Sequence, residues 1–167
     1  METHVPKLSH AVFVYGTLRS GYWNNKAMTR DGGKAEMVGT AATLGKFLLF
    51  ESGIPFVVKS DFLKALQPYN HLTGQIVGEL WNLDDKALAN CDRLESHPTG
   101  YCREETRVQT IKNRAPDTAW LYFYPHFKSL HDATLLRPSR SGLLDWALGH
   151  PRIDGSLLAP DAGEGEV

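Results

Sequence analysis

The stretch that decides the fold is Leu72–Ser96, which reads LTGQIVGELWNLDDKALANCDRLES. Its first half, Leu72–Leu83, carries bulky apolar residues on both alternating faces, which predicts a central strand covered on both sides. Gly74 and Gly78 within this strand indicate a bulge, or a close approach by another backbone or a ligand.

A helix with clear end signals follows the strand directly. Asp84 is suited to be its N-cap, and Leu88, Cys91 and then Leu94 or Glu95 recur at the spacing of one helical face. Pro98 disfavours helical backbone at the residue before it, so the helix is expected to end near Glu95 or Ser96. A strand that leads straight into a capped helix indicates a fold with both α and β elements.

The rest of the chain is dominated by strand signals. Further strands are predicted at His10–Tyr15, within Glu36–Phe50, at Ile54–Val58, at Tyr101–Ile111 and at Ala119–Tyr124. The last two are expected to pair as a hairpin around Asn113–Asp117, whereas Asp61–His71 fits either a loop or a short helical turn. Ser141–Leu148 is predicted to be a short helix. Many strands and few helices in irregular order indicate the α+β class.

The length of 167 residues predicts a single domain, which we place at residues 1–150. Residues 151–167 are expected to be a C-terminal extension that is partly disordered, because their composition is rich in Gly, Ala and Glu.

Charge and cysteine content exclude several classes of protein. Lys plus Arg is 18 and Asp plus Glu is 19, so the chain lacks the basic excess of a nucleic-acid-binding protein. The N-terminal segment Met1–Ser9 has no apolar core of a signal peptide, and no apolar run is long enough for a transmembrane helix. Cys91 and Cys102 are too few for a disulfide framework. We therefore expect a cytoplasmic protein with reduced thiols and no membrane or nucleic-acid partner.

Several common catalytic motifs are absent from the sequence. It has no G-x-G-x-x-G after a strand, no G-x-S-x-G nucleophile elbow, and no phosphate loop with correct spacing. No two histidines lie four residues apart on a credible helix, so no metal site is predicted.

Val12–Gly21, VFVYGTLRSG, is the first of two candidate functional features. An ordinary strand followed by a tight turn would explain it. The alternative is an anion or oxyanion cradle, because Gly16 allows a ligand to approach the backbone closely. In that case the N–H groups of Gly16, Thr17 and Leu18 would converge on one oxygen.

The second feature is Glu95 at the end of the predicted helix. It lies on or beside the apolar face set by Leu88 and Cys91, so its carboxyl is expected near the edge of the core. Desolvation there would raise its pKa, which suits general acid–base catalysis near neutral pH. The structural alternative is a salt bridge with Arg103 or Arg107.

Taken in order, these segments resemble a known family. VFVYGTLRSG resembles the N-terminal signature of the γ-glutamylcyclotransferase-like superfamily. Gly78–Asp84 (GELWNLD), Leu94–Ser96 and Tyr101–Arg103 are similar to its strand, its catalytic-glutamate helix and its Tyr-x-Arg strand. Ile54-Pro55-Phe56 and Glu95-Ser96-x-Pro98 resemble the γ-glutamylamine cyclotransferase branch. The resemblance covers Val12–Tyr124 and leaves the role of the segment after Pro125 open.

The resemblance implies a small mixed β-barrel with a few helices, and an enzyme without a cofactor. The implied reaction converts a γ-glutamylamine, such as γ-glutamyl-ε-lysine, to 5-oxoproline and free amine. Glu95 would be the general acid and base. The loop of Tyr15, Gly16, Thr17 and Leu18 would bind the substrate's α-carboxylate or the oxyanion. Tyr101 would line the pocket, and Arg103 would either bind substrate or support its strand.

Two alternatives to this function stay open at the level of sequence. The first is cyclisation of γ-glutamyl dipeptides or glutathione, and the second is a non-catalytic module that binds a small metabolite. An ionised Glu95 would repel an anionic ligand, which favours the enzyme. The leaving amine and the oligomeric state are not determined by these residues.

Overall fold

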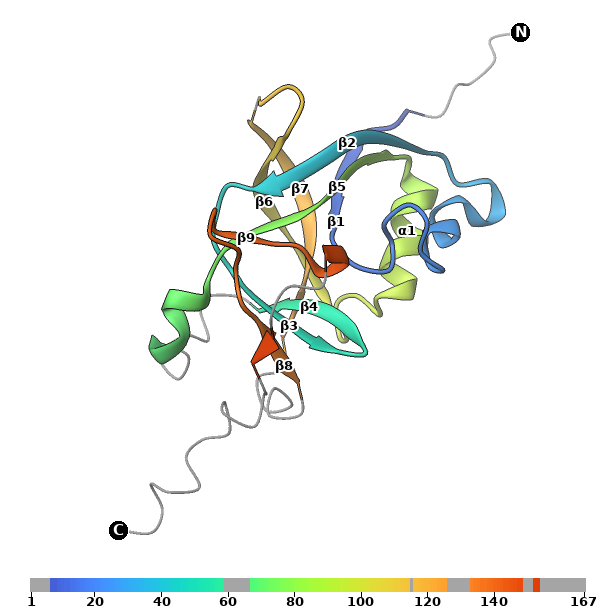
Figure 1. The fold of residues 1–167 in the computed structure, drawn as a ribbon. Coiled ribbons are helices and arrows are strands. Elements are labelled where there is room, and N and C mark those ends of the chain that lie inside the picture. The colour runs from blue at the N-terminus through green and yellow to red at the C-terminus, as the bar shows by residue number, and fades with distance from the viewer. Residues whose placement is uncertain (1–6, 59–66, 115, 126–132, 149–151, 154–167) are drawn as a thin grey trace, which may run out of the picture.

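The computed structural model describes residues 7–58, 67–114, 116–125, 133–148 and 152–153, and its path is shown in Figure 1. The strands are β1 His10–Val14, β2 Ala35–Thr43, β3 Leu48–Ser52, β4 Ile54–Val58, β5 Gln75–Leu83, β6 Cys102–Thr110, β7 Pro116–Tyr124, β8 Thr134–Leu136, β9 Leu143–Leu144 and β10 Arg152–Ile153. The α-helix is α1 Asp85–Leu94, and the 3-10 helices are η1 Asn25–Gly32, η3 Gln67–Leu72 and η5 Trp146–Leu148.

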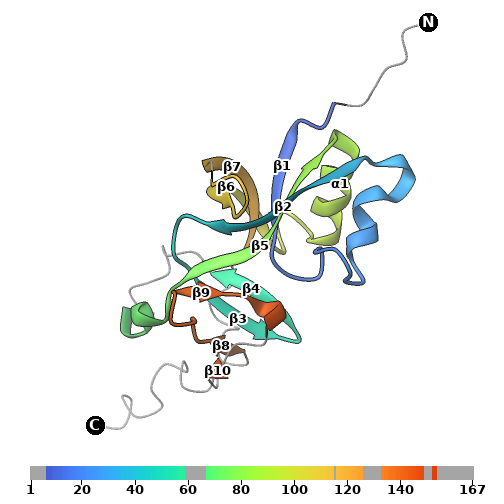
Figure 2. The same cartoon turned by 45° about the horizontal axis from the view of Figure 1, so that its top comes forward.

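Five strands close into a barrel in the order β1-β5-β2-β6-β7, and β7 returns to β1 at the pair Val12 and Trp120. β4 continues the sheet from β7 as a parallel neighbour, followed by β3, β8 and β10. Figure 2 shows α1 on the outside of the barrel next to β1 and β5. The expected α+β fold built on a small mixed β-barrel is confirmed.

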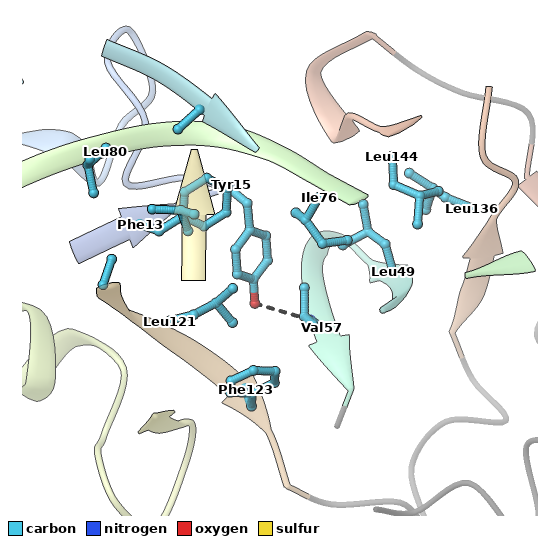
Figure 3. Close-up of a cluster of buried hydrophobic side chains, with 13 residues drawn as sticks. Phe13, Tyr15, Leu49, Val57, Ile76, Leu80, Leu121, Phe123, Leu136 and Leu144 are labelled. Atoms are coloured by element: carbon cyan, nitrogen blue, oxygen red, sulfur yellow. Dashed lines mark hydrogen bonds between the residues drawn. The ribbon is translucent and has the colours of Figure 1, made fainter. Parts of the chain in front are cut away.

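The main core cluster combines inward side chains of the barrel strands with side chains of the neighbouring strands β3, β4, β8 and β9 (Figure 3). Its buried members include Phe13, Tyr15, Leu49, Val57, Ile76, Leu80, Leu121, Phe123, Leu136 and Leu144. A separate cluster packs α1 against the barrel and includes Met28, Leu83, Leu88 and Cys91. Full burial of a Leu, Ile, Val, Phe or Met side chain in these clusters adds about 1.5–3 kcal/mol to the free energy of unfolding.

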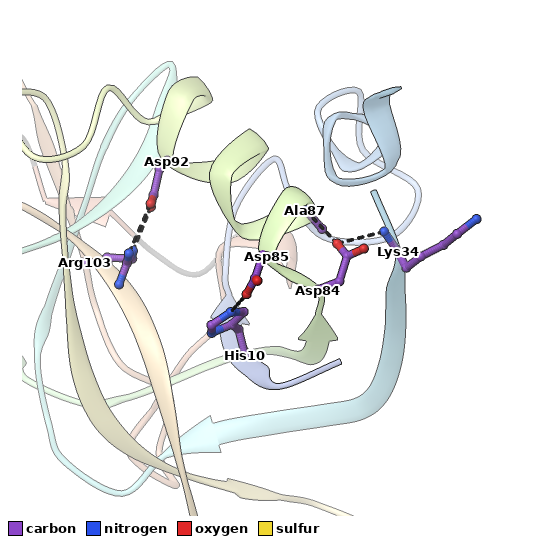
Figure 4. A network of polar contacts seen from close by, with 7 residues as sticks. All are labelled: His10, Lys34, Asp84, Asp85, Ala87, Asp92 and Arg103. Atoms are coloured by element: carbon purple, nitrogen blue, oxygen red, sulfur yellow. Dashed lines mark hydrogen bonds and ion pairs between the residues drawn. The ribbon is translucent and has the colours of Figure 1, made fainter. Parts of the chain in front are cut away.

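Asp84 fixes the start of α1, as its sequence position predicts. Its carboxylate accepts the N–H of Ala87 at 2.8 Å and the N–H of Lys34 at 3.0 Å (Figure 4). The first bond pairs an N–H of the first helical turn that has no partner within the helix. The second bond links the start of α1 to Lys34, just before β2.

At Gly78 the backbone of β5 lies very close to the backbone at the end of β1. A close approach of this kind is one of the two explanations predicted for this glycine. A Cβ atom at this position would lie 2.2 Å from the carbonyl oxygen of Val14. The register irregularity lies instead in the neighbouring strand β2, between Met37 and Gly39. Gly78 therefore allows β5 to pack against the end of β1, where the candidate site begins.

Gly78→Ala is expected to destabilise the fold by about 1–3 kcal/mol or more, because the methyl group meets a main-chain oxygen that cannot rotate away. Urea unfolding monitored by tryptophan fluorescence measures the change. Gly45→Ala is the matched control, since its Cβ would meet only the Phe47 ring at 3.4 Å. Equal stabilities of the two variants would contradict the steric explanation.

Most predicted elements are confirmed, including the strands around His10–Tyr15 and Ile54–Val58 and the β6–β7 hairpin. The helix predicted for Ser141–Leu148 is wrong: this segment forms the short strand β9 and the 3-10 helix η5. Cys91 and Cys102 are both free of disulfide bonds. The domain boundary after residue 150 and the disorder of the last residues stay predictions, because 149–151 and 154–167 lie outside the described residues.

Candidate active site

A pocket lies where the end of β1, the β3–β4 hairpin and the segment after α1 meet. Its cavity volume is about 40 Å³, and its mouth is open to solvent. The lining residues are Phe13, Val14, Tyr15, Gly16, Thr17, Leu18, Ile54, Pro55, Glu95, Tyr101 and Tyr122. All residues predicted for the site line this pocket except Arg103.

The turn after β1 presents free backbone donors to the pocket. The carbonyl of Gly16 accepts the N–H of Arg19 at 3.1 Å, and the carbonyl of Thr17 accepts the N–H of Asn24 at 3.2 Å. No described group accepts a hydrogen bond from the N–H groups of Gly16, Thr17 or Leu18. Unpaired donors at a buried wall are costly unless a ligand or water uses them, so this turn is equipped to bind an oxygen-rich group.

Tyr15 holds the turn in place. Its buried hydroxyl donates to the carbonyl of Tyr122 at 2.7 Å and accepts the N–H of Val57 at 3.1 Å (Figure 3). Burial raises the pKa of Tyr15 well above its ordinary value, so the phenol stays protonated. The Tyr15 hydroxyl thus joins β1 to β7 and β4.

Glu95 is the C-cap residue of α1, where the chain turns toward β6. Its own N–H donates to the carbonyl of Cys91 at 2.9 Å, and its carbonyl accepts the N–H of Tyr101 at 2.9 Å. Ser96, which follows, has a positive φ of 54° that reverses the chain direction. The backbone on both sides of Glu95 is therefore fixed, and its side chain points into the pocket wall.

The Glu95 carboxyl is partly buried and has no charged partner. Burial raises its pKa to about 7. No ion pair or hydrogen bond joins its side chain to another described residue, so the alternative of a salt bridge with Arg103 or Arg107 is wrong for this structure. Burial, together with the charge of Glu95, raises the pKa of Tyr101. The pocket thus holds an unpaired acid beside a protonated phenol.

Arg103 does not line the pocket, and its side chain contacts Asp92 and Trp120 instead. Its Nε donates to Asp92 Oδ1 at 2.8 Å and its Nη2 to Asp92 Oδ2 at 3.2 Å (Figure 4). Its guanidinium also sits 4.3 Å from the ring centre of Trp120. These contacts fit the supporting role that the sequence also allowed, and a contact with substrate stays a prediction.

Asp92 is the centre of this supporting cluster. Besides Arg103, it accepts the hydroxyl of Tyr122 at 2.7 Å. Burial opposes ionisation of Asp92, but the hydrogen bonds from Arg103 and Tyr122 lower its pKa below the ordinary value. An ionised Asp92 therefore anchors the last turn of α1, and with it Glu95, to β6 and β7.

Sequence reasoning missed part of the pocket wall and its support. Phe13, Val14 and Tyr122 look like core strand residues, and Tyr122 is indeed only 4% exposed. Ile54 and Pro55 stand out in the sequence as part of the resemblance, but nothing local places them beside the turn after β1. Asp92 is one helical turn before Glu95, and this spacing is its only sequence signal.

Within the residues that the structure describes, no group of three or more His, Cys, Asp or Glu side chains is placed to hold a metal ion. Over the same residues, no helix has both the length and the apolar character needed to cross a bilayer.

Comparison with known proteins decides the family. Residues 12–146 match the model of the family "Gamma-glutamyl cyclotransferase, AIG2-like". The chain belongs to this family. The match begins in β1 and ends at Trp146 in η5, so it includes residues 126–146 of the segment after Pro125.

Relatives and solved structures agree with the family assignment. The chain is similar to a Methanocaldococcus jannaschii protein provisionally named a gamma-glutamylcyclotransferase, with 34% identity over 68% of this chain and 83% of the relative. It is similar to the human gamma-glutamylaminecyclotransferase, with 34% identity over 63% of this chain and 65% of that protein. The fold matches the crystal structure of an AIG2-like protein from Mus musculus, with a TM-score of 0.59, 23% identity, and coverage of 85% of this chain and 84% of that one.

Proposed function

We propose that the protein converts a γ-glutamylamine, such as γ-glutamyl-ε-lysine, to 5-oxoproline and the free amine, with Glu95 as general acid and base. The observation that carries the proposal is Glu95 itself. It is a partly buried carboxyl with a pKa of about 7 and no ionic partner, in the same pocket as the unpaired N–H groups of Gly16–Leu18. Near neutral pH such a group is suited both to accept and to donate a proton.

The reaction needs no second substrate. The α-amine of the γ-glutamyl group attacks its own γ-carbonyl carbon, a new C–N bond closes the ring, and the original amide C–N bond breaks. Well-oriented intramolecular reactions reach effective molarities on the order of 10⁵–10⁸ M, so holding the reactive conformer lowers much of the barrier. A pocket formed by one small domain is sufficient for this task.

Glu95 acts first as the general base and then as the general acid in this reaction. As a carboxylate it takes a proton from the α-ammonium, which frees the nucleophile. As a carboxylic acid it then protonates the departing amine. The ring nitrogen, which carries one extra proton once the new C–N bond has formed, releases that proton to solvent and becomes the neutral lactam N–H. General acid–base catalysis of this kind contributes about 10²–10⁴-fold.

The backbone turn after β1 would stabilise the negative charge of the substrate. The N–H groups of Gly16, Thr17 and Leu18 would bind either the substrate's α-carboxylate or the oxyanion that develops on the γ-carbonyl oxygen. Because Tyr15 and the Gly16–Arg19 turn already fix these donors, binding requires little reorganisation. Removal of one oxyanion donor from such a site costs about 3–4 kcal/mol of transition-state stabilisation.

The choice of a γ-glutamylamine as substrate rests on similarity and on the pocket wall. The human relative is named a gamma-glutamylaminecyclotransferase, and Ile54 and Pro55 of the branch-like sequence line the pocket. Ile54 is 39% exposed, so one apolar wall extends from the pocket toward solvent. Such a wall would accommodate the methylene chain of a lysine leaving group.

A panel of γ-glutamyl compounds tests the proposal. The purified protein is incubated with γ-glutamyl-ε-lysine, γ-glutamyl-alanine and glutathione, and 5-oxoproline is measured by mass spectrometry. We expect release from γ-glutamyl-ε-lysine only. Release from γ-glutamyl-alanine or glutathione instead would assign a dipeptide or glutathione cyclotransferase. Binding without any release would identify a non-catalytic module.

The pH profile should report the ionisation of Glu95. With a pKa of about 7, the carboxylate is lost as pH falls, so kcat/KM is expected to decline about tenfold per pH unit below that value. Initial rates of 5-oxoproline release between about pH 5 and pH 9 measure the profile. A profile that is flat across neutral pH would show that no group with this pKa acts in the free enzyme.

A further inference from the structure

The segment Ser139–Leu148 returns to the barrel beside the candidate site. Its strand β9 pairs in parallel with the start of β5, and the N–H of Gln75 donates to the carbonyl of Gly142 at 2.9 Å. Leu144 is fully buried in the barrel core. Figures 1 and 2 show β9 alongside β5, so the residues that follow Leu144 start from a fixed position.

Asp145 forms an ion pair with the residue that follows the pocket turn. Arg19 Nη1 donates to Asp145 Oδ1 at 2.9 Å. The two side chains are only 13% and 10% exposed, so the pair is largely removed from water. The same Oδ1 also accepts the N–H of Ala147 at 3.0 Å, which fixes the carboxylate on its own segment. Arg19 is adjacent in sequence to Leu18, the last residue of the turn that lines the pocket.

Trp146 contacts residues of the two chain segments that continue from the pocket, without touching the pocket lining itself. Its indole N–H donates to Glu51 Oε2 at 2.9 Å, and Glu51 lies in the hairpin that carries Ile54 and Pro55. Its ring lies 5.2 Å from that of Tyr22, in the loop that continues from the pocket turn. One residue thus joins the β3–β4 hairpin to the loop that follows the pocket turn.

A second carboxylate holds the neighbouring residue of the same loop. Glu79 of β5, which is 6% exposed, accepts the N–H and the hydroxyl of Ser20, both at 2.7 Å. Arg19 and Ser20 are therefore anchored from two directions, by Asp145 and by Glu79. The loop is fixed immediately beyond the turn whose N–H groups are unpaired.

We propose that Asp145 and Trp146 are positioning residues for the active site: they hold the turn Gly16–Leu18 at a fixed distance from the Ile54–Pro55 wall. The inference rests on the proposed function for its catalytic consequence, although its structural part is independent of turnover. Neither residue lines the pocket, so both act through Arg19, Tyr22 and Glu51. A misplacement of about 1 Å in such a site can lower the rate about 10²-fold.

The test combines amide hydrogen exchange with kinetics. Asp145→Asn removes the charge that Arg19 faces, and we expect amides in the segment of residues 16–20 to exchange at least about tenfold faster than in the parent. With γ-glutamyl-ε-lysine we expect a raised KM and a fall in kcat/KM of about 10- to 100-fold. The pH at which activity declines should stay the same, because Glu95 is untouched.

Matched variants separate positioning from general damage. Asp85→Asn removes an acid from the more exposed pair with His10 and is expected to leave exchange and kinetics unchanged. Trp146→Phe keeps an aromatic ring beside Tyr22 but loses the bond to Glu51, and it should raise KM even if Asp145→Asn folds poorly. The double variant Arg19→Gln with Asp145→Asn should be no worse than the single Asp145 variant, since both remove one shared contact.

Anchoring of the turn by Asp145 and Trp146, and its effect on catalysis, are tested by separate results. If the parent protein releases no 5-oxoproline from any γ-glutamyl compound, the proposed function fails, and exchange of residues 16–20 still tests the anchoring. Unchanged exchange in both Asp145→Asn and Trp146→Phe would overturn the anchoring. Faster exchange with unchanged kcat/KM in an active enzyme would overturn the catalytic role.

Discussion

Glu95→Gln is expected to reduce 5-oxoproline release by about 10²–10⁴-fold, because the amide can neither accept the proton of the α-ammonium nor protonate the leaving amine. The two side chains are nearly equal in size, so the pocket keeps its shape. The fall should therefore appear in kcat, with little change in KM. Initial rates with γ-glutamyl-ε-lysine at several concentrations measure both constants.

The same substitution is expected to stabilise the fold above neutral pH. Burial raises the folded-state pKa of Glu95 from 4.5 to about 7, so ionisation favours the unfolded chain. This penalty is absent below about pH 4.5, grows as pH rises through the interval between the two pKa values, and is complete above about 7. After allowance for water at the pocket, Glu95→Gln should gain about 1–2 kcal/mol near pH 8 and nothing near pH 4.

Glu105→Gln is the matched control for the fall in activity. Glu105 is exposed on β6 and does not line the pocket, so its substitution should leave the rate of 5-oxoproline release unchanged. A Glu95→Gln protein that releases 5-oxoproline at the parental rate would remove Glu95 from the mechanism. A loss of activity with a loss of stability at all pH values would indicate structural damage instead.

Gly16→Val is expected to lower kcat/KM by about 10²-fold or more. A Cβ atom at Gly16 would lie 2.8 Å from Cγ of Pro55, and a buried proline ring has little freedom to move away. The added side chain must therefore push the turn away from the hairpin, and with it the donors that would bind the substrate. A misplaced turn affects binding and the transition state together, so both KM and kcat should change.

Gly45→Val provides the comparison for Gly16→Val. Gly45 is exposed, and a Cβ there meets only the Phe47 ring at 3.4 Å, so activity is expected to stay at the parental level. Binding of 5-oxoproline by calorimetry adds a readout without turnover. Parental KM and kcat in Gly16→Val would contradict the assignment of the turn to substrate binding.

The elements around the pocket could be predicted from sequence because their signals are local. The β-branched and aromatic residues of His10–Tyr15 predict a strand, and Gly16 ends it. Asp84 and Pro98 set the limits of α1, which places Glu95 at its end. The family resemblance then linked these separate elements to one pocket and one reaction.

The helix expected at Ser141–Leu148 failed because tertiary contacts override its local pattern. Leu144 is buried among barrel residues, and the free edge of β5 supplies backbone partners at Gln75 and Ile76. A strand pair across this distance in sequence leaves no periodic signal within the segment. The contacts of Asp145 with Arg19 and of Trp146 with Glu51 also join residues that are distant in sequence, so no local pattern predicts them.

The partner of Arg103 could not be predicted from the sequence. Its position allowed either a substrate contact or structural support, and both Asp92 and Glu95 lie close by in sequence. The structure places the guanidinium on Asp92 through two hydrogen bonds. Which carboxylate an arginine selects depends on the geometry of the β6–β7 hairpin against α1, which is not encoded in the spacing.

The most direct test of the account is the fate of oxygen during turnover of γ-glutamyl-ε-lysine in water labelled with heavy oxygen. Intramolecular attack by the α-amine uses no water, so we expect 5-oxoproline without label and free lysine in equal amounts, with Glu95→Gln nearly inactive. Mass spectrometry of the products distinguishes this from hydrolysis. Labelled glutamate as the first product would contradict cyclisation and show that the pocket activates water instead.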